Sequence, residues 1–194
     1  MRPECAGVTL ARGVPNGQRG GLGGFSIADG AIDIGGQGLD ASGARLDLFA
    51  RAIAVNAGVW ADAIHVAAGA AELATADGSI IVTAPGTPAQ PAPCFALDVA
   101  ALGGMYAGAI QLIGTEAGLG VNVAGDLASL ERGFSLDVNG KLTLSGRITS
   151  GGTIDIKAQE AEVTGAAYAD GPLGLQCAVL SPATASSRAG AILR

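Results

Sequence analysis

Residues 123–129 read VAGDLAS, and residues 144–150, which lie 21 positions further along the chain, read LSGRITS. Both copies place a glycine third, a charged residue fourth, an aliphatic residue fifth and a serine last. Repeats of about 20 residues are typical of a coil whose turns stack on one another, because one turn alone cannot bury its apolar face. Leu136 and Val138 are expected to return 18 residues later as Ile154 and Ile156. This repetition predicts a parallel β-solenoid.

Short apolar-polar-apolar triplets recur around this repeat, and their period of two predicts strands with one buried face. Gly, Asn, Asp and Ser separate the triplets, and the amphipathic helices of 10 to 15 residues that a βαβ fold requires between its strands are not predicted. An antiparallel sandwich or barrel is the alternative all-β fold. The triplets occupy residues 25–27, 32–34, 53–55, 64–66, 110–112, 136–138, 142–144 and 154–156.

The composition fits a narrow coil. Hydrophobic residues make up 49% of the 194 positions but aromatic residues only 4%, so small and branched aliphatic side chains must fill the core of a single domain. The 32 glycines disfavour helical bundles. We expect an irregular entry segment at 1–23, regular turns at 24–161 and an irregular tail at 162–194. Four of the eight prolines fall within 84–93, which we expect to leave the coil because proline lacks the N–H that a ladder needs.

The charge distribution bears on partners. The net charge is −6, and residues 52–131 contain seven acidic residues and neither lysine nor arginine. A polyanion would be repelled, so nucleic acid is not an expected partner. No segment is long and apolar enough to predict a membrane span, and residues 1–7 lack the apolar run of a secretory signal.

The sequence contains no recognisable catalytic set, and we expect neither enzymatic activity nor a cofactor. His65 is the only histidine, which excludes a serine protease triad within the chain, and three scattered cysteines predict no metal site. His65 is expected on the outer surface of a strand. Outward carboxylates could instead form the acid and base of a carbohydrate-active β-helix enzyme, which is the catalytic alternative. They are Asp33, Asp98, Asp137 and Asp155.

Two longer stretches are more specific than a generic coil. The first, residues 25–69, contains GGQGLDA at 35–41 and ARAIAVNAGVWA at 50–61. The second reads DVAALGGMYAGAI at 98–110 and continues with TEAGLGV at 115–121. Together they resemble the later half of the haemagglutination-activity domain of two-partner-secretion exoproteins, a group that includes filamentous haemagglutinin and contact-dependent growth inhibition proteins. The resemblance covers about residues 7–158.

This resemblance implies a right-handed parallel β-helix that an outer-membrane transporter recognises in the periplasm. It implies a non-enzymatic secretion and adhesion module with a role in virulence. Such a module is secreted or held at the surface of a Gram-negative bacterium, and a host or bacterial cell surface is a further expected partner. Arg51 and Tyr106 are the candidate transporter contacts. The family's leading portion, including its signal peptide, has no counterpart here, so we interpret the chain as a fragment of such an exoprotein. A structural β-solenoid remnant without autonomous function is the alternative.

Overall fold

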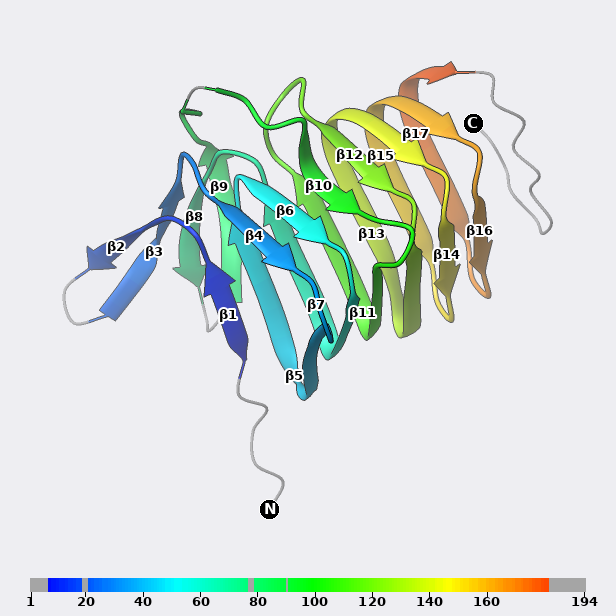
Figure 1. Cartoon of the computed structure of the whole chain (residues 1–194), viewed down its shortest axis with the longest axis horizontal. Helices are drawn as coiled ribbons and strands as arrows, with labels where there is room; N and C mark the ends of the chain where they lie inside the picture. Colours follow the sequence, from blue (N-terminus) through cyan, green and yellow to red (C-terminus); the bar gives the residue numbers. More distant parts are fainter. Residues whose placement is uncertain (1–6, 19–20, 77–78, 90, 182–194) are drawn as a thin grey trace.

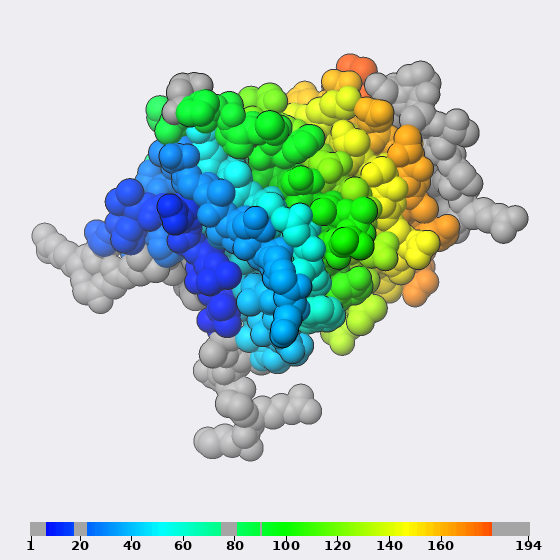
Figure 2. Space-filling view, in the orientation of Figure 1, coloured from blue at the N-terminus to red at the C-terminus, as the bar shows by residue number. Residues whose placement is uncertain are grey.

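The computed structural model describes residues 7–18, 21–76, 79–89 and 91–181. These residues form seventeen strands and no helix. Most strands belong to a coil whose turns follow one another along the long axis of the molecule, with a smaller sheet near the N-terminal end (Figure 1). The surface accordingly shows the chain's segments as successive bands in sequence order (Figure 2).

Parallel pairing joins the strands of one coil face from end to end. Each strand lies in register with a strand of the next turn, so the ladder is unbroken across seven strands. In stacking order they are β1 (Val8–Ala11), β5 (Leu39–Ala50), β7 (Gly58–Ala68), β11 (Gly104–Gly114), β13 (Asp126–Leu144), β15 (Ile154–Val163) and β17 (Leu173–Ser181).

Two further parallel ladders complete the coil. One consists of β4 (Ala31–Ile34), β6 (Ala52–Val55), β10 (Phe95–Val99), β12 (Gly120–Val123) and the later parts of β13, β15 and β17. The other consists of the early parts of β5, β7, β11 and β13, followed by β14 (Arg147–Ser150) and β16 (Ala166–Ala169). The all-β parallel solenoid expected from the sequence is therefore confirmed.

The core is a set of aliphatic stacks inside the coil. Alternate residues point inward, so each inward side chain rests on its equivalent one turn away, and the members of one stack are at most 3% exposed. One such stack runs through Leu48, Val66, Leu112, Leu136 and Ile156. The outward residues Asp33, Asp137 and Asp155 are exposed, as expected.

The repeat that predicts the fold is in the expected register. Asp126 pairs with Arg147 and Ser129 with Ser150, an offset of 21 residues. The offset of 18 expected for the neighbouring repeat is wrong, because Leu136 pairs with Ile156 and Val138 with Ala158. A slip of two residues keeps every side chain on its own face, so alternation alone does not fix this register.

Glycines stack at one corner of the coil because the turns approach each other too closely there for a side chain. A Cβ on Gly146 would lie 2.0 Å from the carbonyl oxygen of Gly125, and one on Gly125 would lie 2.1 Å from that of Gly103. Gly165 repeats the contact on Gly146 at 2.0 Å. This glycine column explains the third position of the VAGDLAS and LSGRITS repeats.

A second, antiparallel sheet covers part of the outside of the coil. Its strands are β2 (Val14–Gln18), β3 (Gly21–Ile27), β8 (Ala71–Ala76) and β9 (Ser79–Pro85). Ile27 and Leu73 form a small core with the outward side chains of Phe49 and Ala67. The triplet at 25–27, expected as a turn of the coil, therefore belongs to this sheet.

The paired strands extend past both limits of the expected 24–161 body. β1 lies before it, and β16 and β17 lie after it, within the expected irregular segments. Three of the four residues of β16 are alanine, so the apolar alternation is weak there, whereas β17 begins with the alternating Leu173 and Leu175. Residues 86–89 and 91–94 contain no strand. The parts of the entry and tail at 1–6, 19–20 and 182–194 lie outside the described residues.

Candidate functional site

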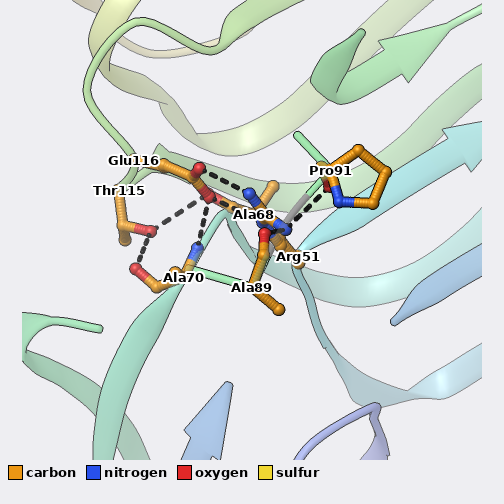
Figure 3. Close-up of polar contacts among 7 residues, drawn as sticks. All are labelled: Arg51, Ala68, Ala70, Ala89, Pro91, Thr115 and Glu116. Atoms are coloured by element: carbon orange, nitrogen blue, oxygen red, sulfur yellow. Dashed lines mark hydrogen bonds and ion pairs between the residues drawn. The ribbon is translucent and has the colours of Figure 1, made fainter. Parts of the chain in front are cut away.

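Arg51 is buried, and its side chain bonds to two segments that lie far from it in the sequence (Figure 3). Its Nε and Nη2 donate to the two carboxylate oxygens of Glu116 at 3.0 and 2.9 Å. Its Nη1 donates to the carbonyls of Ala89 and Pro91, the latter at 3.1 Å. This bidentate pair and its two carbonyl acceptors, here called the Arg51 clamp, fix the Pro-rich segment against the coil.

The surroundings of Glu116 complete the clamp. One Glu116 oxygen also accepts the backbone N–H of Ala70 at 3.1 Å, and the Thr115 hydroxyl donates to the Ala70 carbonyl at 2.9 Å. The hydrogen bond from Arg51 lowers the pKa of the Glu116 carboxyl below its ordinary value, and the same bond raises the pKa of Arg51. Both groups are therefore charged at neutral pH.

The structure places Arg51, one of the two predicted transporter contacts, inside the fold. The residue is 1% exposed, and its guanidinium donors are engaged within the chain. The contact of Arg51 with a transporter stays a prediction. The sequence pattern gave no indication of this burial, because arginine normally lies at the surface unless it is paired.

Tyr106 is partly exposed and stacks on Trp60, which lies at the same position one turn away. The ring centroids are 5.9 Å apart and the planes differ by 15°. A Cβ on Gly58 would come within 2.3 Å of the indole, and one on Gly104 within 2.8 Å of the phenol oxygen. Glycine two residues before each ring therefore leaves room for it. Trp60 was not a predicted site residue, but the matching GVW and GMY triplets would have identified it.

A groove of about 390 Å³ lies beside the aromatic pair. The corners of β5 and β13 beside the groove are longer than those of β7 and β11, because residues 41–45 pair with 61–63 and residues 129–133 pair with 107–109. Glu131 folds over Gly108, since a Cβ there would lie 3.3 Å from its carboxylate. The side chains that define this groove, here called the aromatic groove, are Ser42, Trp60, Asp62, Tyr106, Leu130, Glu131 and Arg132.

The four carboxylates of the catalytic alternative do not face one another on adjacent strands. Asp33 and Asp98 both pair with Ala54, so a whole strand separates them. Asp137 pairs with Lys157, and Asp155 pairs with Ser135. His65 is half-buried, and its Nδ1 lies 3.4 Å from the Asp47 carboxylate. Among the described residues there is no cluster of three potential metal ligands, and no helix of a length and polarity suited to crossing a membrane.

Comparisons with known proteins agree with this architecture. Residues 4–144 match the model of the TPS secretion domain family. Over 141 residues the chain is 40% identical to the tRNA nuclease CdiA-2 of Burkholderia pseudomallei (strain 1026b), and over 144 residues it is 39% identical to the toxin CdiA of Yersinia pestis. These matches cover 72% and 74% of this chain but only 4% of each relative.

The crystal structure of the filamentous hemagglutinin secretion domain superposes on this fold with a TM-score of 0.58. The superposition covers 96% of this chain and 59% of that one, at 24% sequence identity, which establishes a shared fold. The identities to the CdiA proteins and the family match extend this likeness to the sequence. The chain belongs to the TPS secretion domain family of two-partner-secretion exoproteins.

Proposed function

We propose that the chain acts as the secretion module of a CdiA-like or filamentous-haemagglutinin-like exoprotein, is recognised by an outer-membrane transporter, and has no catalytic activity of its own. The observation that carries this proposal is the match of residues 4–144 to the TPS secretion domain family. The nuclease activity is named for the whole relative, and the match to this chain covers only 4% of that relative's length. Location outside a Gram-negative cell follows from the same proposal.

The proposed transporter contact includes Tyr106. Its ring is partly exposed, and it lies beside Trp60, which is 41% exposed, and Leu130, which is 69% exposed. Large apolar side chains that remain accessible on a small domain are typical of protein interfaces. Arg51 would influence this contact only through the fold, because the clamp encloses it.

A secretion assay tests the proposal. The chain, fused to a signal peptide, would be produced in a Gram-negative host with or without a two-partner-secretion transporter of a CdiA protein. The protein should accumulate outside the cell only when the transporter is present. Tyr106→Ala should reduce this release, whereas Asp33→Asn, at an exposed position on the separate ladder that contains β4, should not. Equal periplasmic retention with and without the transporter would contradict the proposal and favour a structural solenoid without autonomous function.

A further inference from the structure

Asp47 is a carboxylate on the outer side of the coil, yet it is only 1% exposed. In the parallel ladder it lies between Thr9 of β1 and His65 of β7. Its Oδ2 accepts hydrogen bonds from Arg45 Nε at 3.1 Å and from the Thr9 hydroxyl at 3.3 Å, and Arg45 Nη2 lies 3.0 Å from the same oxygen. This one oxygen therefore links β1, the first strand of the ladder, to β5.

The other oxygen of Asp47, Oδ1, is buried and has no hydrogen-bond partner in the part of the chain that the structure describes. Nδ1 of His65 lies 3.4 Å from it, which is longer than an ordinary N–H···O hydrogen bond. A buried acceptor without a partner destabilises a fold. A neutral imidazole carries a proton on only one of its two nitrogens, whereas the protonated ring donates from both. Protonation of His65 therefore supplies Oδ1 with a charge-assisted hydrogen bond.

Asp47 is negatively charged over the whole range in which histidine side chains change charge, about pH 5 to 8. Burial raises the pKa of the Asp47 carboxyl, but the hydrogen bonds and positive charges of His65 and Arg45 outweigh burial and hold that pKa below its ordinary value of 3.8. The group of this cluster that titrates near neutral pH is therefore His65.

The other groups that face His65 do not reverse the attraction of Asp47. Gln111, the ladder neighbour of His65 on β11, is uncharged. Arg45 opposes protonation of the imidazole, but its own charge is paired with Oδ2 of Asp47. The remaining charges that line the hollow beside the ring have opposite signs; they are Arg132 and Asp155. The imidazole is 32% accessible, so it exchanges protons with water.

β1 is the end strand of its ladder, and within the described residues it pairs with β5 alone. Its inward side chains, Val8 and Leu10, are 39% and 38% exposed, although the two β5 leucines on which they stack are fully buried. A strand with so little burial opens more readily than the turns behind it. Opening of β1 removes Thr9 from Asp47 and lets water reach that carboxylate, which weakens its attraction for a charged His65.

We propose that His65 and Asp47 form a pH-dependent latch that holds β1 on the coil and tightens when His65 is protonated. The charged pair is stronger while β1 covers it than after β1 opens, so protonation of His65 and closure of β1 favour each other. The added stability is present in mild acid and is lost as the pH rises and His65 releases its proton. The latch acts within the folded coil, and it goes beyond the proposed secretion role without resting on it.

Amide hydrogen exchange of the purified chain, followed by NMR between about pH 5.5 and about pH 7.5, measures how often β1 opens. One probe is the Arg12 N–H, which donates to the Phe49 carbonyl at 2.7 Å at the end of β1. After correction for the intrinsic pH dependence of exchange, protection of the β1 amides should be about three- to ten-fold greater at the acidic end. His65 is the only histidine, so its ring resonances report its protonation directly, and both quantities should share one midpoint.

Three substitutions make the test specific. His65→Gln keeps a polar side chain that cannot gain a proton, so the protection of β1 should lose its pH dependence. Asp47→Asn removes the charge that a protonated imidazole faces, so the pH dependence should vanish there as well. Asp155→Asn is the matched control, because it removes the other carboxylate beside His65 and should keep the pH dependence of the unaltered chain.

An equal rise of protection in His65→Gln would overturn the latch, and so would β1 protection that is the same at both ends of the pH range in the unaltered chain. β1 amides that exchange without protection would also overturn it, because a strand that is not closed cannot be latched. Loss of the pH dependence in Asp155→Asn but not in Asp47→Asn would refute the pairing of His65 with Asp47.

Discussion

The substitution Glu116→Gln tests whether the Arg51 clamp holds the Pro-rich segment on the coil. It preserves the size of the side chain but removes the negative charge that faces a side chain with 2% exposure. The guanidinium would keep the carbonyls of Ala89 and Pro91 as acceptors, so it would not lose every partner. What it would lose is the counter-charge for a cation held away from water.

The expected cost follows from this geometry. Removing one partner of a buried ion pair destabilises a protein by about 3–5 kcal/mol, and the two remaining carbonyl acceptors place this case near 3 kcal/mol. For a domain of this length, such a loss lowers the Tm by about 6–12 °C. Replacing both partners, as in Arg51→Met with Glu116→Leu, should cost less than the two single changes added together, because no charge is left unpaired.

Thermal unfolding followed by circular dichroism at neutral pH measures the effect. Glu162→Gln is the matched control, because it breaks the exposed pair with Lys141, where both side chains are at least 40% accessible, and it should change the Tm little. Equal Tm values for Glu116→Gln and the unaltered chain would refute the idea that the clamp stabilises the fold.

The pH dependence gives a second measurement on the same variant. The pKa of Glu116 in the folded chain lies below its ordinary value of 4.5. The stability that Glu116 contributes is therefore complete above pH 4.5 and is lost as the pH falls through the folded-state pKa. The difference in Tm between the unaltered chain and Glu116→Gln should therefore shrink as the buffer is taken from neutral pH to about pH 3. A difference that is constant with pH would exclude this linkage.

Two further substitutions test the coil itself. Gly146→Ala should destabilise the domain by about 1–3 kcal/mol in urea unfolding, because its Cβ would overlap the carbonyl of Gly125, and an unchanged midpoint would show that the turns can separate there. Ile110→Asp places a carboxylate in the aliphatic core and should lower the Tm by about 10 °C or more. Asp155→Asn, at an exposed outward position, should leave the Tm unchanged, and equal shifts for these two substitutions would contradict the assigned register.

The coil was predictable from the sequence because its physical requirements repeat. Inward aliphatic residues and the corner glycine recur at 21 residues in VAGDLAS and LSGRITS, and both requirements act locally on each turn. The register of Leu136 was not predictable, since Phe134, Leu136 and Val138 all point inward and a shift by two preserves the pattern. Antiparallel pairing of residues 25–27 was equally hidden, because alternation is the same in both kinds of sheet.

The candidate site was only partly predictable. Tyr106 was selected through the LGGMYAG motif, and its partner Trp60 has the same Gly-x-aromatic spacing one turn away. The groove itself depends on the difference in corner length between neighbouring turns, which becomes visible only when the turns are aligned. Arg51 is an internal ion-pair partner because Glu116, 65 residues away, meets it in space. No short sequence pattern could predict a contact between residues that are 65 positions apart.

The parallel ladder continues across the segment between β7 and β10 that leaves the coil, and this continuity has a practical consequence. The chain leaves the coil after β7 and returns at β10, yet Leu97 and Val99 lie directly on Ile53 and Val55 as if nothing intervened. Since the entropy of closing a loop grows only slowly with its length, inserts of different size can occupy this place at similar cost. A peptide grafted into this segment should therefore leave the coil folded, provided that the carbonyls of Ala89 and Pro91 keep their contacts with Arg51.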